Sequence, residues 1–384
     1  MDFAESSEHS MLRAAIAKLA AGFGHRYFLE RSRDGRGMGE LWDAVFANGF
    51  GAVNIPEEFG GGGRGIQELA IIVEELCAAG CPLLMQVVSS GICGSVLAAH
   101  GTPAQRDDWL PRLAEGRAKM CFAITEPDAG SNSHKIATRA RKDGDRWILN
   151  GSKYYTTGVD QADAVLVVAK TGTRENGRGV LSLFIVDADA SGFVKKPIEM
   201  EIVEPEKQFL LSLDDVVVPA EGLVGATDGA GLKQMFAGLN PERITASAKA
   251  TGLGRYFLDR ATAYARDRQV WDVPIGAHQG IAHPLAAAKV KLELARLATT
   301  RAAWLYDNGL DAGEAANMSK LASADASIDC FEAAIQTHGG NAYATEFGIA
   351  HLWGLTRLAR SAPVSREMAL NYVAIHSLDL PRSY

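Results

Sequence analysis

The chain has 384 residues, of which 47% are hydrophobic and 22% are charged. This composition is typical of a globular protein with a large core, and it excludes a mostly disordered chain. The formal net charge of −7 and the lack of long basic runs argue against a nucleic-acid-binding protein.

Residues 1–118 have a helical pattern. In MLRAAIAKLAAGF, GELWDAVFANGF, IQELAIIVEELCAAG and PAQRDDWLPRLAEG, apolar residues recur at spacings of three and four, and Gly or Pro separates the segments. The acidic start of the chain is unlike a signal peptide, and no apolar run approaches the roughly 20 residues of a membrane span. Five scattered cysteines indicate reduced thiols. We therefore expect a soluble, cytoplasmic protein, by its size an enzyme.

Two motifs in this region are weak signals. The run GGGGRG at 60–65 matches a dinucleotide-binding fingerprint, but no strand precedes it and no acidic residue follows at the required distance. Cys77 and Cys81 lack a partner pair or a histidine at a zinc-site spacing. We expect a flexible glycine loop and two ordinary buried thiols, and no metal site.

Residues 119–228 predict a β domain. Runs such as ADAVLVVAK, LSLFIVDA and FLLSLDDVVVP are rich in β-branched and aromatic residues, and Asp143-Gly144 and Asn150-Gly151 are both typical of hairpin turns. Because no long helical pattern separates these runs, we expect an antiparallel or mixed sheet rather than a parallel βαβ array.

Residues 229–384 return to longer helical patterns. A stripe of mainly apolar residues follows His283 at spacings of three and four, while Lys289, Glu293 and Arg296 fall on other faces; the stripe comprises Leu285, Ala288, Leu292, Ala295, Thr299, Ala302 and Tyr306. Such a stripe is typical of a helix in an antiparallel bundle. The chain is thus predicted to be α+β, with a helical domain (1–118), a β domain (119–228) and a second helical domain (229–384).

Three segments in order resemble the acyl-CoA dehydrogenase family of flavoproteins: CFAITEPDAGSNSHKIATRARKDGDRWILNGSKYYTTG, RDRQVWDVPIGAHQGI and IQTHGGNAYATE. The likeness extends over nearly the whole chain. It implies a C-terminal four-helix bundle and FAD-dependent dehydrogenation of an acyl-CoA thioester in fatty acid metabolism. It also implies a homotetramer or homodimer that passes electrons to an electron-transfer flavoprotein.

The resemblance also assigns a flavin site. The segment from Phe122 to Ser131 would lie along the isoalloxazine ring, Tyr155 would stack on it and Thr157 would approach N5; for Tyr155 the alternative is an aromatic that fills the core of a plain hairpin. Arg268 would reach the FAD pyrophosphate of a neighbouring subunit, or would simply be an arginine at a helix end. The cofactor-binding candidates are Phe122, Ile124, Thr125, Gly130, Ser131, Tyr155, Thr157, Arg268, Trp271, Gln279, Gln336, Gly340, Ser365 and Glu367.

The catalytic base is missing from its usual family position. A gapless alignment from Arg357 to Glu367 places Pro363 there, and Glu367 falls at a position used for adenosine contacts. Some family members carry the base instead on a helix over the substrate, just before an arginine, and LNPERITASA offers Glu242 and Arg243 at that place. We therefore assign Glu242 as the base and assign Arg243, with Ser131, to substrate binding.

The residues also leave two alternatives open. Asn240 and Pro241 before Glu242 also form an ordinary helix start that needs no catalysis. Pro363 has no backbone N–H with which to polarise the thioester oxygen. Either the Val364 N–H takes this role, or the oxyanion site has one donor fewer, or the protein catalyses a different reaction. Asp272 also departs from the glycine usual beside the adenosine.

Two other functions are compatible with the sequence. The chain is either a non-catalytic or half-site subunit of a heteromeric dehydrogenase, or a flavin oxygenase or reductase of the same fold. The intact TEPDAGS segment argues against the first of these, because a subunit without flavin need not keep it.

Overall fold

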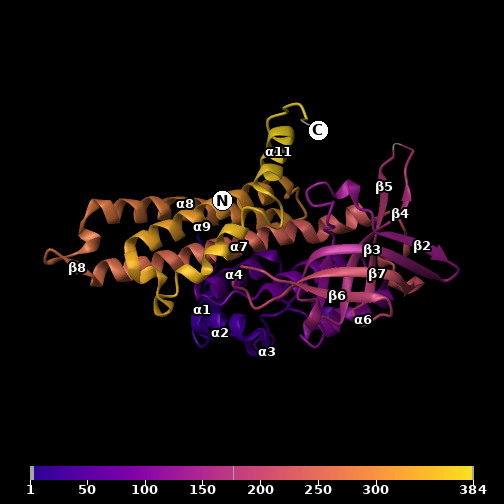
Figure 1. Ribbon diagram of the computed structural model, residues 1–384, viewed down its shortest axis with the longest axis horizontal. Coiled ribbons are helices and arrows are strands. Elements are labelled where there is room, and N and C mark those ends of the chain that lie inside the picture. Colours follow the sequence, from indigo (N-terminus) through magenta and orange to yellow (C-terminus); the bar gives the residue numbers. More distant parts are fainter. Residues whose placement is uncertain (1–3, 176, 383–384) are drawn as a thin grey trace.

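The computed structural model describes residues 4–175 and 177–382. Its N-terminal region is helical, as expected (Figure 1). A Thr102–Gln105 capping box with Pro at the first turn begins one of the helices. The GGGGRG run is a loop that ends where the next helix begins. The elements are α1 (Ser7–Ala20), α2 (Gly24–Asp34), α3 (Gly39–Ala47), η1 (Glu57–Phe59), α4 (Ile66–Ala78), the π-helix η2 (Gln86–Gly94), α5 (Ser95–His100) and α6 (Pro103–Ala114).

The central region is a mixed seven-stranded sheet, which confirms the expectation from the sequence. β4 is parallel to β1 and β2, and the other paired strands are antiparallel. The order is β1-β4-β2-β3-β7-β6, with β5 beside β4. The strands are β1 (Met120–Ala123), β2 (Arg139–Asp143), β3 (Arg146–Thr157), β4 (Ala164–Thr173), β5 (Gly179–Asp187), β6 (Phe193–Ile198) and β7 (Gln208–Pro219).

Only one of the two expected turns is a hairpin. Gly144 connects β2 to β3 with a φ of 63°, which glycine adopts without strain. Asn150 and Gly151 instead lie inside β3, where the register with β7 shifts. The Asn150 side chain donates to Asp215 Oδ1 at 2.8 Å, and a Cβ on Gly151 would lie 2.6 Å from the Thr138 backbone. Asn150 and Gly151 therefore mark a β-bulge and not a hairpin turn, although the same residue types favour both.

Three long helices dominate the C-terminal region, and α11 projects away from the body (Figure 1). The stripe predicted after His283 is confirmed, since its central residues are buried on α8. These helices follow the sheet and two 3-10 turns along the chain, and short helices complete the region. The elements are α7 (Gly231–Asp267), β8 (Gln269–Val270), β9 (Val273–Pro274), α8 (Gln279–Asp307), α9 (Gly313–His338), η8 (Gly339–Tyr343), α10 (Trp353–Leu358) and α11 (Arg366–His376).

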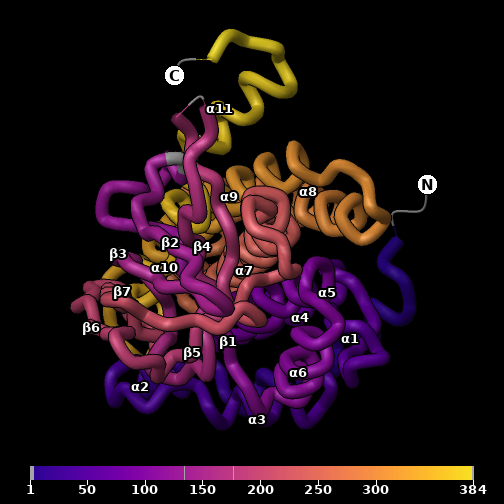
Figure 2. Tube along the Cα trace, turned by 90° about the vertical axis from the view of Figure 1, so that its right-hand side faces the viewer, coloured from indigo at the N-terminus to yellow at the C-terminus, as the bar shows by residue number. Residues whose placement is uncertain are grey.

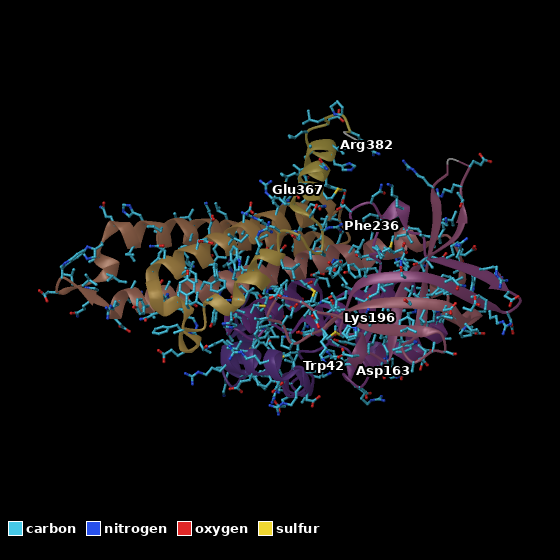
Figure 3. All side chains as sticks on the ribbon, in the orientation of Figure 1. Trp42, Asp163, Lys196, Phe236, Glu367 and Arg382 are labelled. Carbon is cyan, nitrogen blue, oxygen red and sulfur yellow. The ribbon has the colours of Figure 1, made fainter. Side chains whose placement is uncertain are left out.

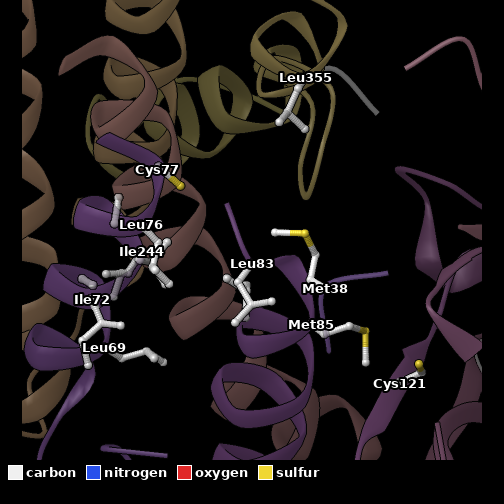
Figure 4. Close-up of a cluster of buried hydrophobic side chains, with 14 of the residues drawn as sticks. Met38, Leu69, Ile72, Leu76, Cys77, Leu83, Met85, Cys121, Ile244 and Leu355 are labelled. Carbon is white, nitrogen blue, oxygen red and sulfur yellow. The ribbon is translucent and has the colours of Figure 1, made fainter. Parts of the chain in front are cut away.

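A common core joins the three regions, with the N-terminal helices and the sheet both beside α7 (Figure 2). Its side chains come from helices of both helical regions and from the sheet, including Ile72, Met85, Cys121, Ile244 and Leu355 (Figure 4). All five cysteines are buried, as expected of Cys77 and Cys81.

A buried cluster of charges also joins α1, α4, α7 and α8. Glu74 and Glu75 of α4 are 6% and 4% exposed. Arg13 lies 2.6 Å and Arg296 2.7 Å from Glu74, and Arg255 pairs with Glu75. Burial opposes ionisation of Glu74, but these arginines outweigh it and lower its pKa. Ion pairs therefore connect the N-terminal helices to the C-terminal helices. Removal of one partner would leave the other charge buried and uncompensated.

No helix in the part of the chain that the structure describes is long and apolar enough to cross a membrane.

Candidate active site

A cavity of ≈ 1660 Å³ lies between the sheet, α7 and the loop after α10. Its mouth lies beside Leu232 and Phe236 of α7, which are 42% and 48% exposed, and its lining is more buried further along α7, where Leu253 is 2% exposed. Figure 3 shows Phe236 between the sheet and the projecting α11. The cavity brings together many of the residues predicted for the site, namely Phe122, Ile124, Thr125, Gly130, Ser131, Tyr155, Thr157, Glu242, Arg243 and Ser365.

A buried ion pair, which the sequence analysis missed, holds the segment after β1. Lys153 of β3 is fully buried and donates to Glu126 Oε1 at 2.9 Å and to the Ile124 carbonyl at 3.1 Å. The N–H groups of Ala137 and Thr138 donate to the same carboxylate. Burial opposes ionisation of Glu126, yet Lys153 and these donors outweigh it and lower its pKa. The ion pair and these hydrogen bonds therefore hold the cavity wall between β1 and β2 in place. The sequence signal for the ion pair was a lysine at an inward-facing position of a strand.

The same wall suits a flat aromatic cofactor with a polar edge. Tyr155 has a φ of 56° and is 50% exposed, so the alternative that it fills a core is wrong. Its ring centroid lies 4.1 Å from that of Tyr154, which leaves an aromatic surface on the cavity. The Thr157 hydroxyl donates to Gln208 Oε1 at 3.1 Å, and no atom lies within 4 Å of a Cβ built on Gly130. Ring surface, hydroxyls and open backbone together fit a flavin.

Glu242 lies in the first third of α7, well inside the helix, and lines the cavity. The alternative of a helix start is wrong, because α7 begins at Gly231 and Pro241 lies inside it. Burial raises the pKa of Glu242 to about 7, although Arg243 and Lys320 act in the opposite direction. A carboxyl group that is desolvated and titrates near neutrality has the property required of a general base.

Arg243 beside it retains donors for a ligand. Its Nη1 donates to the Leu239 carbonyl at 3.3 Å and to Asn240 Oδ1 at 3.1 Å. Its buried Nε has no hydrogen-bond partner among the described residues. Burial lowers the pKa of Arg243, while Glu242 raises it. A partly buried guanidinium whose Nε–H is unused is suited to an anionic or carbonyl group.

The loop after α10 faces Glu242 across the same cavity. Pro363 and Val364 both line it. Lys320 of α9, which is 2% exposed, donates through Nζ to the Val364 carbonyl and so holds the loop in place. Burial lowers the pKa of Lys320 to about 8. The sequence analysis missed this lysine, whose signal was a long charged residue on a buried face of α9 that consists mostly of small residues.

Five predicted residues lie far from the cavity of their own chain. Figure 1 places β8 at one end of the helices and the sheet at the other. These residues are exposed around β8 and β9, and Trp271 is 83% exposed. Asp272, which stands at the family's glycine position, keeps the left-handed backbone with a φ of 61°. The five residues are Arg268, Trp271, Gln279, Gln336 and Gly340.

Glu367 does not face the main cavity. It lies in the first turn of α11 and lines a separate hollow of ≈ 310 Å³ together with Ser365 and three arginines (Figure 3). It is exposed, so it lacks the desolvated surroundings of Glu242. The described residues contain no group that could hold a metal ion.

Comparison with known proteins identifies the family. The acyl-CoA dehydrogenase N-terminal, middle and C-terminal domain models match residues 6–117, 121–208 and 229–377. Acyl-CoA dehydrogenase FadE12 of Mycobacterium tuberculosis is 53% identical over 384 residues, covering 100% of this chain and 99% of the relative. The chain belongs to the acyl-CoA dehydrogenase family. It is accordingly an FAD-dependent oxidoreductase, as the resemblance implied.

Other relatives of this acyl-CoA dehydrogenase agree. The probable acyl-CoA dehydrogenase YngJ of Bacillus subtilis is 34% identical over 81% of this chain and 80% of the relative. A glutaryl-coenzyme A dehydrogenase solved with glutaryl-CoA has a TM-score of 0.94 at 28% identity, covering 100% of this chain and 98% of that one. PigA, solved with FAD and proline, has a TM-score of 0.93 at 25% identity, covering 99% of this chain and all of that one. These similarities confirm the predicted fold class.

Proposed function

We propose that this protein dehydrogenates the α,β carbon–carbon bond of an acyl-CoA thioester, with Glu242 as the base. The observation that carries the proposal is the desolvated Glu242 carboxyl, which shares one cavity with Tyr155, Thr157 and the segment after β1. In the same cavity Pro363 offers no acid or base at the usual family position.

The chemistry places three demands on the chain. FAD, when bound, supplies the oxidant that accepts the β-hydrogen with its electron pair. Glu242 takes the weakly acidic α-proton, and its burial raises its proton affinity toward that of a useful base at neutral pH. The cofactor is held by Thr125, Ser131 and Thr157, with Tyr155 against its ring. The cavity walls exclude water from the reacting carbons.

The developing enolate oxygen needs donors other than residue 363. The Val364 N–H has no partner within residues 4–175 and 177–382, and its own carbonyl is held by Lys320. We assign the Val364 N–H as a donor to this oxygen. We assign the guanidinium of Arg243, which lies on α7 and lines the same cavity, as a second donor. Loss of one oxyanion donor costs about 3 kcal/mol of barrier, so a replacement for the missing N–H is required.

The exposed set around β8 and β9 supports a homodimer or homotetramer. Arg268 and Trp271 lie at the opposite end of the long helices from the chain's own cavity, so they serve a flavin only in a second copy. An electron-transfer flavoprotein is the proposed electron acceptor, as the family resemblance implies.

Anaerobic mixing of the purified protein with a panel of acyl-CoA thioesters tests the function. We expect a yellow protein, about one FAD per chain, whose flavin absorbance is bleached by at least one thioester. A colourless homomeric protein that does not take up FAD would favour a non-catalytic subunit. A yellow protein that no thioester bleaches, but that a nicotinamide donor reduces, would favour the oxygenase or reductase.

A further inference from the structure

Charged side chains line the more buried part of the cavity. Glu204 and Glu206, on the segment between β6 and β7, line it together with Lys249 of α7. Their neighbours on the same walls are apolar, among them Leu84, Val87 and Leu253. An acyl group made only of methylenes would leave these charged side chains facing hydrocarbon, which is unfavourable.

One carboxyl group in this cluster is left over. Lys249 Nζ lies 2.9 Å from Glu204 Oε1, and both side chains are largely buried, so their charges compensate each other. Glu206 is 3% exposed and its Oε2 has no hydrogen-bond partner among the described residues. Burial and the charge of Glu204 raise the pKa of Glu206 to about 7, although Lys249 acts in the opposite direction. Both its neutral and its ionised form are therefore accessible near neutral pH.

The cluster is at the right place to meet the far end of an acyl chain. Lys249 follows Glu242 by seven residues on α7, so both lie on the same face, about 10.5 Å apart along the helix axis. The large and charged CoA moiety requires the open mouth beside Leu232 and Phe236. With the α-carbon at Glu242, the acyl chain then extends toward Glu206.

We propose that Glu206 selects acyl-CoA substrates whose acyl group ends in a hydroxyl group. The proposal rests on the acyl-CoA dehydrogenation proposed above and names its substrate class. A hydroxyl group is both donor and acceptor, so it satisfies Glu206 Oε2 in either protonation state. A terminal carboxylate is disfavoured, because two glutamates already share one lysine here.

Binding of redox-inert thioether analogues of acyl-CoA to the holoenzyme tests the proposal. Straight-chain analogues of increasing length are compared with ω-hydroxy analogues of the same length by calorimetry. At the optimal length we expect the hydroxyl to lower Kd by about tenfold or more, since a buried polar group is then no longer unpaired. Glu206→Leu should remove this preference and improve binding of the plain chain, and Glu206→Gln should keep part of the preference.

Glu58→Leu, which removes an exposed carboxylate of η1, is the control and should keep the full preference. Equal or weaker binding of the ω-hydroxy series at every length, or a preference that survives in Glu206→Leu, would overturn the proposal. Flavin bleaching by the corresponding reactive thioesters is measured separately. If bleaching is absent while the Kd preference holds, dehydrogenation is wrong and the hydroxyl site stands.

Discussion

Replacement of Glu242 by Gln should separate catalysis from stability. The folded carboxyl has a pKa of about 7 and the unfolded carboxyl one near 4.5, so the folded state holds its proton more tightly. As pH rises between these values, the unfolded state loses its proton first and wild-type stability falls. The difference corresponds to about 3 kcal/mol once pH exceeds 7. Gln has no charge to desolvate, so the variant should be more stable than wild type above pH 7, and nearly equal to it at pH 4.

The same variant should be nearly inactive. Positioned general-base catalysis contributes roughly 10²–10⁴ in rate, and the amide cannot accept the α-proton. Stopped-flow bleaching with a substrate should show a wild-type rate that rises through pH 7 and a low, pH-independent rate for the variant. Urea unfolding at pH 5 and pH 8 measures the stability. A variant that bleaches like wild type, or that is less stable at pH 8, would refute the assignment of a desolvated base.

Three further changes probe other parts of the site. Arg268→Ala should weaken FAD retention during gel filtration by about tenfold or more, because a charge-assisted contact to the pyrophosphate is lost; unchanged retention would remove Arg268 from the site. Lys153→Met leaves the Glu126 carboxylate buried without its cation and should lower the free energy of unfolding by about 3–5 kcal/mol; a loss below 1 kcal/mol would show that the pair holds nothing. Pro363→Glu in the Glu242→Gln background should restore part of the bleaching rate, because it returns both a carboxylate and an N–H; a rate no higher than that of Glu242→Gln alone would count against residue 363 as the family's base position.

Matched controls distinguish these effects from general damage. Arg266→Ala removes a neighbouring exposed arginine of α7 and should leave FAD retention as in wild type. Lys196→Met removes an exposed lysine of β6 and should change the free energy of unfolding by less than about 0.5 kcal/mol.

The order of helical and β regions followed from the sequence because it depends on local periodicity. The stripe on α8 was predictable because apolar residues spaced by three and four positions lie on one face of a helix, and that face is buried. Turn residues were less decisive, since Asn150-Gly151 serves a bulge inside β3 as well as it would serve a hairpin. Pro241 gave a similarly ambiguous signal, because a preceding helical segment from Gly231 continues through it.

The candidate site was only partly predictable for a different reason. Tyr155 and Glu242 were predicted because the resemblance supplied a proposed role for each, and the structure places both on one cavity. Lys320 and Glu206 were missed because their meaning depends on groups distant in the chain, the Val364 carbonyl for one and Lys249 for the other. A buried charged side chain needs a specific partner, whereas an exposed one does not. The pattern of a single sequence does not show whether an isolated charged residue is buried.

The arginine–glutamate cluster between α4 and the later helices has a consequence for how the chain is made. Glu74 leaves the ribosome 222 residues before its partner Arg296. At elongation rates of roughly 5–20 residues per second this is a delay of roughly ten to forty seconds. Until α7 emerges, Arg13 is the one arginine of this cluster that has been synthesised, and Arg255 precedes Arg296 by 41 residues. The fully paired cluster can therefore form only after α7 and α8 have been synthesised.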